Sequence, residues 1–152
     1  MSVESKLKEM GIELPVAPKP VAAYVPAVKI DGYVYTAGQI PLVNGEVKFK
    51  GKLGKDLSED QGYEAAKTCA LNCLSVIKGQ VGSLDDIVQI VKVTGFVSSA
   101  PGFNAQPKVI NGASELLGKL FGDKGAHARS AVGVNELPLD AACEVEMIVK
   151  VK

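Results

Sequence analysis

The sequence has no excess of charge of either sign. Its 152 residues include 17 Lys and Arg against 17 Asp and Glu, so the formal net charge at neutral pH is zero. Proteins that bind nucleic acid usually carry a basic excess that pairs with phosphates. One segment contains four lysines, Lys48, Lys50, Lys52 and Lys55. The acidic residues Asp56, Glu59 and Asp60 follow at once, which is typical of a solvated loop. The charge balance argues against a nucleic-acid partner.

Long apolar runs are also missing. No stretch approaches the roughly 18 consecutive apolar residues that suggest a membrane-spanning helix. The first residues, MSVESKLKEMGIELP, lack the apolar core of a signal peptide. Cysteine is scarce, and the odd set Cys69, Cys73 and Cys143 lies within apolar runs, which favours reduced thiols. Together these features predict a cytoplasmic protein without a membrane anchor.

The common catalytic and metal-binding patterns are absent. There is no GxSxG elbow, no P-loop and no GxGxxG. Cys69 and Cys73 lie four positions apart, but no second cysteine pair and only one histidine, His127, exist to complete four ligands. We therefore expect no metal. His127 is either a general base or an incidental loop residue next to Arg129.

The chain contains instead a series of strand-like and helix-like segments. Its length fits one domain, 1–152, with a short helix and a Pro-rich extension in residues 1–20. Ser2 caps the first helix, which ends before Gly11. Further on, Asp31-Gly32 and Asn44-Gly45 predict the turns of two hairpins.

Two longer helices are expected. Ser58 and Gln61 form a capping box for a helix that ends at Gly82-Ser83. Its apolar face comprises Ala65, Ala66, Cys69, Ala70, Cys73, Leu74 and Ile77. The second helix lies within residues 104–122, with Gly122 as its C-cap. Its apolar stripe comprises Val109, Ile110, Ala113, Leu116, Leu117 and Leu120.

Strands are predicted around residues 86–99, 129–135 and 143–151, besides those of the hairpins. Strands and helices do not alternate strictly, which predicts an α+β fold with a mixed β-sheet and two helices on one face. Each helix has only one apolar stripe. The other face of the sheet must therefore be exposed or meet another subunit.

Arg129 opens the strand that continues Ser-Ala-Val-Gly-Val. Side chains alternate along a strand, so Arg129, Ala131 and Gly133 share one face. The β-branched side suits the core under the helices, which predicts Arg129 on the open face. Its small neighbours leave room for a carboxylate held by the guanidinium. The alternative is a surface salt bridge with a glutamate.

Glu144 and Glu146 share one face of the last strand, and the apolar residues between them suit the core. If residues 138–140 form a hairpin turn, Glu144 pairs near Val134. Arg129 then lies five positions further along, roughly 16 Å away. Within one chain, these charges cannot hold one small substrate. They can do so if subunits pack in a closed ring.

These segments carry a resemblance to a known family. ARSAVGVNELPLDAACEVEM, residues 128–147, resembles the C-terminal signature of the Rid family of reactive-intermediate enamine/imine deaminases, also called YjgF-type or L-PSP-type proteins. YTAGQIP, residues 35–41, is similar to the family's T-S-G-Q-I-P. Tyr24 and Asn111 stand where the family has a tyrosine and a helix asparagine. The similarity covers about residues 20–152.

The resemblance implies a chorismate-mutase-like, YjgF-like fold and a homotrimer around a central β-barrel, with sites in the clefts between subunits. It implies hydrolysis of 2-imino and enamine acids, such as those from 2-aminoacrylate, to 2-oxo acids and ammonia, without a cofactor. Arg129 would hold the substrate carboxylate, and Glu144 would position water and move protons. The backbones of Gly38 and Ala131 would bind substrate, Tyr24 would wall the pocket, and Asn111 would support it.

The sequence departs from the family pattern at two of these positions. Ala37 replaces the serine before the glycine, which removes a hydroxyl donor, and Ala131 replaces a frequent cysteine. Two other hypotheses stand beside the deaminase. One is a non-catalytic binder of small carboxylates or 2-oxo acids, which needs Arg129 and Gly38 but not Glu144. The other is an endoribonuclease or translation inhibitor, which the zero net charge disfavours.

Overall fold

The computed structural model describes residues 1–17 and 23–152. Part of the Pro-rich extension, residues 18–22, lies outside the described residues. The order of the main elements confirms the predicted α+β class with a mixed sheet. The elements are α1 (Val3–Glu9), β1 (Ala27–Ile30), β2 (Tyr33–Thr36), β3 (Leu42–Val43), β4 (Glu46–Val47), α2 (Glu59–Val81), β5 (Ile87–Ser98), α3 (Gln106–Phe121), β6 (Ala128–Val134) and β7 (Cys143–Val151).

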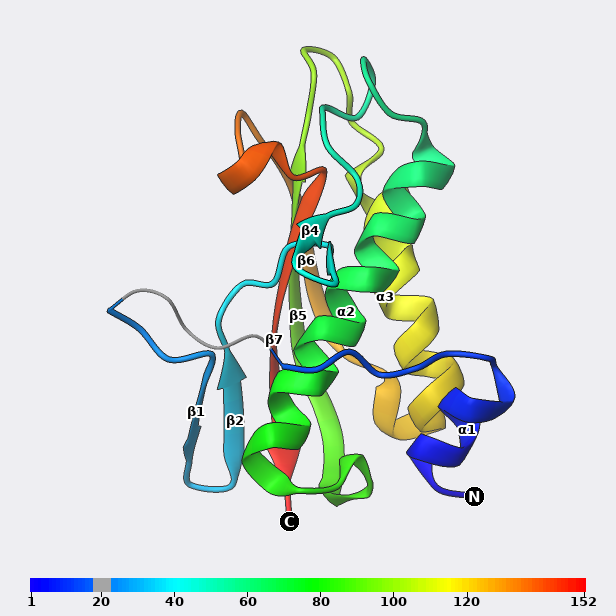
Figure 1. Ribbon diagram of the computed structural model, residues 1–152, viewed down its shortest axis with the longest axis vertical. Coiled ribbons are helices and arrows are strands. Elements are labelled where there is room, and N and C mark those ends of the chain that lie inside the picture. Colours follow the sequence, from blue (N-terminus) through cyan, green and yellow to red (C-terminus); the bar gives the residue numbers. More distant parts are fainter. Residues whose placement is uncertain (18–22) are drawn as a thin grey trace.

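One five-stranded sheet, in the order β1-β2-β7-β5-β6, carries the fold. Figure 1 shows α2 and α3 side by side on one face of this sheet, with α1 at the outer side of α3. The strands β3 and β4 form a separate two-stranded sheet. Two helices therefore cover one face, as the single apolar stripe on each predicts.

Both predicted hairpin turns are present. Asp31 and Gly32 have φ values of 50° and 77° between β1 and β2, and Asn44 and Gly45 have 52° and 82° between β3 and β4. Successive positive φ values match the twist of antiparallel strands, and Asn, Asp and Gly tolerate them best. These local signals were sufficient to place the two turns.

The helix α2 begins where its capping box predicts. The Ser58 hydroxyl accepts from the Gln61 amide at 3.2 Å, and the Ser58 amide donates to the Gln61 side chain at 2.9 Å. Gly82, with φ of 86°, ends the helix. All residues of the predicted apolar faces of α2 and α3 are buried. Burial of such faces supplies most of the stability of helices in a domain.

The helix α3 crosses from the end of β5 to the start of β6, and the two strands are parallel. Parallel neighbours need a crossover of this kind, because a tight turn joins only antiparallel strands. The strand β7 is antiparallel to β5 on its other side. The predicted hairpin between the last two strands is therefore wrong: β5 lies between them, and Pro138–Asp140 forms a short 3₁₀ turn.

The face of the sheet opposite the helices is partly apolar and uncovered in the subunit. Val28, Ile30, Tyr35 and Val132 on this face are 44–55% exposed. Alternation with buried residues such as Val34, Val145 and Met147 places these side chains on the open face. Exposed apolar side chains gathered on one sheet face mark a contact surface. Among the described residues, no helix combines the length and the hydropathy needed to cross a bilayer.

Candidate active site

The strand β6 turns its Arg129 side toward the helices, so the predicted facing of Arg129 is wrong. Ala131 packs against the core, whereas Val132 is 44% exposed on the open face. The reason is that β6 is an edge strand close to α3. Small side chains fit beneath the helix there: a Cβ on Gly133 would lie 2.7 Å from Gln106 Nε2 and 3.0 Å from Ser99 Oγ. The β-branched side chains are left outside.

Two residues of α3 hold the Arg129 guanidinium. Its Nη1 donates to Asn111 Oδ1 at 2.8 Å and to Ser114 Oγ at 3.2 Å. Asn111 and Ser114 are three positions apart, so they lie on the same side of the helix. Asn111 was singled out from the sequence, but Ser114 was not. The spacing from Asn111 was the signal that could have found it.

Arg129 has no acidic partner within the described part of the subunit. The ion pairs recorded there are Lys52–Glu136 at 3.2 Å and Lys78–Glu4 at 3.9 Å. The alternative of a surface salt bridge between Arg129 and a glutamate is thus not realised within the described residues. A half-buried guanidinium without a carboxylate is available to an anionic ligand.

Glu144 and Glu146 lie on the open face, away from the helices, as the alternation along β7 predicts. Both are half-buried between buried neighbours, including Cys143 and Val145. Burial first, and the nearby Glu146 second, raise the pKa of the Glu144 carboxyl above its ordinary value. A carboxyl with a raised pKa is a stronger base once it is ionised.

The segment after β2 brings Gly38 onto Glu144. Gln39 and Val145 exchange backbone hydrogen bonds at 2.8 and 3.0 Å, which aligns this segment with β7. Any Cβ on Gly38 would overlap the Glu144 carboxylate. The Ala37 amide donates to Pro26 O at 2.8 Å, whereas no acceptor is recorded for the Gly38 amide among the described residues. The absence of a side chain on Gly38 thus makes room for the Glu144 carboxylate, and the Gly38 amide is a backbone donor beside it.

Tyr24 lies in the segment that leads into β1, and 57% of it is exposed. Ala37 is half-buried at the end of β2, next to Gly38. Ala131 is half-buried on the helix side of β6. The predicted site residues therefore form two groups. Asn111 lies on α3, with Arg129 and Ala131 on the strand beside it, and Glu144 and Gly38 lie on the open face.

These two groups cannot enclose one small molecule within a subunit. Along the register, Glu144 lies beside Phe96 and Phe96 beside Val132, while Arg129 lies beside Val93. Glu144 is thus two strands across and three positions along from Arg129, about 10 Å in each direction. The two side chains also leave opposite faces of the sheet. Any site that uses both of them must combine two subunits.

His127 is not an incidental loop residue. Its Nε2 lies 2.9 Å from Ser114 Oγ, and its Nδ1 lies 2.6 Å from the Gly125 carbonyl oxygen. Both ring nitrogens are therefore occupied, and Ser114, which binds one of them, also binds Arg129. This arrangement leaves no free nitrogen for a general base at the open face.

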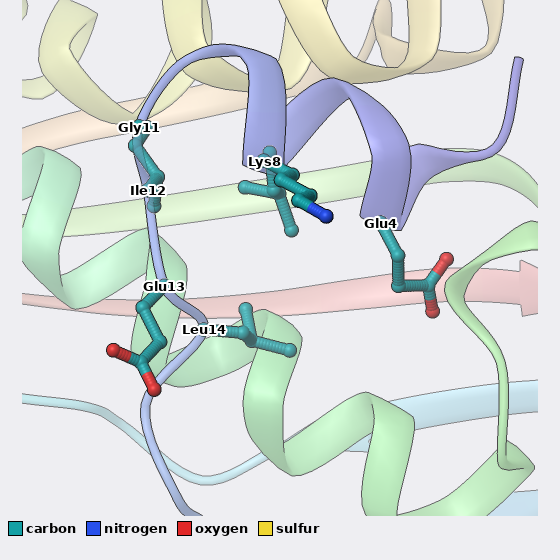
Figure 2. Close-up of a pocket in the computed structure, with 7 residues that line it drawn as sticks. Glu4, Lys8, Gly11, Ile12, Glu13 and Leu14 are labelled. Atoms are coloured by element: carbon teal, nitrogen blue, oxygen red, sulfur yellow. The ribbon is translucent and has the colours of Figure 1, made fainter.

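Three hollows among the described residues lie elsewhere. The largest of the three, about 660 Å³, lies between residues 13–17, the β3–β4 hairpin and α2. Figure 2 shows one of about 380 Å³ between α1 and the chain that follows it, lined by Glu4, Leu7, Lys8, Gly11, Ile12, Glu13 and Leu14. A smaller hollow on the open face, of about 110 Å³, is lined by Tyr35, Thr36, Lys92, Thr94, Glu146, Met147 and Ile148. None of the site residues predicted from the sequence lines any of these three hollows.

The three cysteines are buried and reduced. Cys69 Sγ lies 3.7 Å from Cys143 Sγ, and Cys73 Sγ lies 3.2 Å from the Val145 carbonyl oxygen. No group of three or more His, Cys, Asp or Glu within residues 1–17 and 23–152 has the geometry to hold a metal ion. The thiols therefore serve as small core side chains.

We expect the native thiols to resist an aromatic disulfide reagent. Burial raises the pKa of the Cys73 thiol to about 12 and that of Cys69 well above its ordinary value. Because the thiolate is the nucleophile, both burial and protonation suppress the reaction. Absorbance of the released thiolate should stay near zero in buffer and reach three equivalents in denaturant. Fast labelling of the folded protein would contradict this core.

The chain belongs to the family described as "YjgF/chorismate_mutase-like, putative endoribonuclease", which matches residues 4–151. It is similar to Protein TCP17 of Trypanosoma cruzi, with 40% identity over 149 residues, 97% of this chain and 93% of the relative. It is also similar to the 2-iminobutanoate/2-iminopropanoate deaminase of Dermatophagoides farinae, with 29% identity over 141 residues, 93% of this chain and 95% of the relative.

Solved structures give the same result. A structure titled as a putative endoribonuclease from Shewanella oneidensis matches with a TM-score of 0.96 and 30% identity, over 99% of this chain and 100% of that one. Atu1372 of Agrobacterium tumefaciens, of unknown function, matches with a TM-score of 0.93 and 40% identity, over 99% and 92%. E. coli TdcF with bound serine matches with a TM-score of 0.62 and 26% identity, over 90% and 94%.

Proposed function

We propose that the protein hydrolyses 2-imino acids and their enamine forms to 2-oxo acids and ammonia, without a cofactor. The observation that carries the proposal is the state of Arg129. Its guanidinium is half-buried, is fixed by Asn111 and Ser114, and has no carboxylate partner among the described residues. Such a group suits the carboxylate of a small substrate.

The donor geometry of Arg129 fits this role. A guanidinium has five N–H donors, and the two on Nη1 point to Asn111 and Ser114. The edge formed by Nε and Nη2 remains for a ligand. Two parallel N–H donors on one edge match the two oxygens of a carboxylate. The helix contacts therefore orient the free edge as well as hold the side chain.

We propose that the site is shared between subunits of a closed homotrimer. Arg129 and Asn111 of one subunit would face Gly38 and Glu144 of the next. The Gly38 amide would donate to the substrate, Tyr24 and Ala37 would form the wall, and the Ala131 backbone would contact the imine nitrogen. The uncovered apolar face of the sheet supports an assembly of this kind.

The reaction follows from these roles. Glu144 accepts a proton from a water molecule as the water oxygen forms a bond to the imine carbon. The C–N π bond gives its electron pair to nitrogen, which takes up a proton from solvent, so a carbinolamine forms. Glu144 then returns its proton to the nitrogen, the C–N single bond breaks and ammonia leaves. The hydroxyl group left on the carbon loses its proton to solvent and becomes the carbonyl of the 2-oxo acid. One water is consumed for each ammonia released.

The relatives support this choice of substrate. The Dermatophagoides farinae relative is named a deaminase of 2-iminobutanoate and 2-iminopropanoate. E. coli TdcF was solved with serine, which carries a carboxylate and an adjacent nitrogen as a 2-imino acid does. Three buried reduced thiols also fit a reducing compartment such as the cytoplasm.

The direct assay uses 2-aminoacrylate generated enzymatically in the cuvette. We expect the protein to accelerate release of pyruvate and ammonia above the spontaneous rate, and an Arg129→Ala variant to remove the acceleration. Equal rates with and without the wild-type protein, across several small imino acids, would favour the alternative of a non-catalytic binder of small carboxylates or 2-oxo acids. The endoribonuclease function has less support, because the net charge of zero offers no general attraction for phosphates.

Assembly gives a separate prediction. Light scattering on a sizing column should report a mass of three times 15.9 kDa. The open face carries exposed apolar side chains whose burial favours association, and the two halves of the site lie on opposite faces. A stable monomer at micromolar concentration would contradict the shared site.

The replacement Glu146→Gln should shift the acid limb of the pH profile. The pKa of Glu144 is raised by burial and then by Glu146, so removal of the Glu146 charge lowers it. Because the ionised carboxylate is the base, kcat/KM rises with pH through this pKa. Its midpoint should therefore move to lower pH in the variant. A midpoint that stays in place would show that another group controls the limb.

A further inference from the structure

His127, Ser114 and Arg129 form a chain of hydrogen bonds behind the proposed carboxylate site. The Gly125 carbonyl oxygen lies 2.6 Å from His127 Nδ1, and His127 Nε2 lies 2.9 Å from Ser114 Oγ. Ser114 Oγ accepts from Arg129 Nη1 at 3.2 Å. These residues come from three elements: the turn after α3, the helix itself and β6.

The direction of each bond follows from the ends of the chain. A carbonyl oxygen can only accept, so Nδ1 of His127 carries the proton. In the neutral ring, Nε2 is then an acceptor, and the Ser114 hydroxyl donates to it. The oxygen of Ser114 consequently presents its lone pairs to the Arg129 N–H. The opposite tautomer would place two acceptors 2.6 Å apart at Gly125.

We propose that His127 is a positioning residue, which acts through Ser114 to fix the orientation of the Arg129 guanidinium. The part that concerns substrate rests on the proposed function. Asn111 alone accepts one N–H, and the guanidinium can pivot about a single bond. The second bond to Ser114 sets its plane. The free Nε and Nη2 edge then points in one direction.

The position of His127 explains why its ring must be fixed too. Ser114 has one hydroxyl proton, which it can give to His127 or to solvent. An acceptor at Nε2 draws this proton away from Arg129 and leaves the lone pairs toward the guanidinium. Preorganised donors bind a ligand better because less conformational freedom is lost on binding. His127 therefore affects affinity without touching the ligand.

The composition of the chain makes a direct test possible. His127 is its only histidine and Arg129 its only arginine, so the side-chain nitrogen-15 signals of each can be assigned without overlap from another residue of the same type. In the ligand-free protein, at a pH where the ring is neutral, we expect the Nδ1–H tautomer. The Nε2–H tautomer would overturn the proposal. The Arg129 Nε–H should be rigid in the wild type and mobile in Ser114→Ala and His127→Leu.

A double-mutant cycle tests the coupling. Ser114→Ala and His127→Leu should each weaken pyruvate binding by about 3- to 10-fold, as expected for one lost hydrogen bond. The double variant should bind pyruvate no more weakly than the weaker-binding single variant, because both changes break the same chain of hydrogen bonds. His127→Gln offers an acceptor near the place of Nε2 and should restore affinity to within about 2-fold of wild type.

Several results would overturn the proposal. Independent, multiplying effects of the two changes would show that His127 does not act through Ser114. If Arg129→Ala abolishes pyruvate binding but Ser114→Ala and His127→Leu leave the affinity unchanged, Arg129 does not need the hydrogen bonds of Ser114 and His127 to bind the ligand. If the wild type fails to bind pyruvate, the proposed function fails instead. The NMR signal of Arg129 then still tests the positioning role of His127. An Nε–H that is as rigid in both variants as in the wild type refutes that role.

Discussion

Arg129→Ala is expected to remove binding of pyruvate and 2-oxobutanoate, with the subunits folded and assembled as before. A charge-assisted hydrogen bond contributes about 1.5–3 kcal/mol, so loss of two from the Nε and Nη2 edge should weaken binding by at least about 100-fold. The fold should persist, because β6 is an edge strand and the side-chain hydrogen bonds of Arg129 within the described residues go only to Asn111 and Ser114. Isothermal calorimetry measures the affinity, and thermal unfolding checks the fold.

Two controls sharpen the Arg129 experiment. Arg129→Lys keeps the charge but loses the two-pronged fork, so binding should fall to an intermediate level. Lys124→Ala removes an exposed charge from the turn before β6 and should leave the affinity unchanged within experimental error. If Arg129→Ala binds 2-oxo acids as tightly as wild type, the arginine has a purely structural role and the proposed function loses its main support.

Glu144→Gln should separate chemistry from binding. The substitution keeps the size of the side chain and one acceptor oxygen but removes the base. Positioned acid–base groups contribute about 10²- to 10⁴-fold to a rate, so turnover should fall by that range. Affinity for pyruvate, which depends on Arg129, should stay within a few-fold of wild type. Coupled detection of the 2-oxo acid gives the rate, and calorimetry gives the affinity.

Gly38→Ala provides a matched test at the same place. A methyl group on Gly38 would overlap the Glu144 carboxylate, so the base must move. Turnover should fall although no ionisable group is lost. Full turnover in Glu144→Gln would assign proton transfer to another group, and Tyr24 would be the next residue to replace. His127 is a poorer candidate, because both of its nitrogens are hydrogen-bonded near Arg129.

The elements that local chemistry determines were predictable from the sequence. The Asp31-Gly32 and Asn44-Gly45 turns depend on the few residues that accept positive φ. The start of α2 coincides with the capping box of Ser58 and Gln61. The facing of Glu144 also followed from alternation, because β7 is a central strand with one face fully covered by helices. For the two turns and the start of α2, the cause lies within a short stretch of sequence.

The predictions were wrong where the structure depends on contacts between distant parts of the chain. The sequence does not state that β5 inserts between β6 and β7, because strand order depends on which partners the crossover helix brings together. The facing of Arg129 failed for the same reason. Alternation correctly placed Arg129 and Ala131 on the same face of their strand. The assumption that bulky residues face the helices does not hold at an edge strand that α3 approaches closely.

The Arg129 site itself was only partly predictable. Asn111 came from the resemblance to a family, and Arg129 from its unusual place in a strand. Ser114 was indicated only by its spacing from Asn111, and His127 only by its place next to Arg129, because serine and histidine are common on helices and in loops. Their importance appears only when α3 and the turn after it lie against β6. Contacts between elements distant in sequence can be identified only in the folded structure.

The most direct test of a shared site is complementation between two inactive variants. Arg129→Ala and Glu144→Gln subunits should be co-expressed in equal amounts with different tags, and the doubly tagged trimers assayed for imine hydrolysis beside each variant alone. In a randomly mixed population before tag selection, an intact Arg129 meets an intact Glu144 in about one interface in four, which predicts about a quarter of wild-type activity. Doubly tagged trimers should exceed this value, because every one contains an intact interface. Activity no higher than that of either variant alone, in mixed trimers of the correct mass, would contradict the shared site.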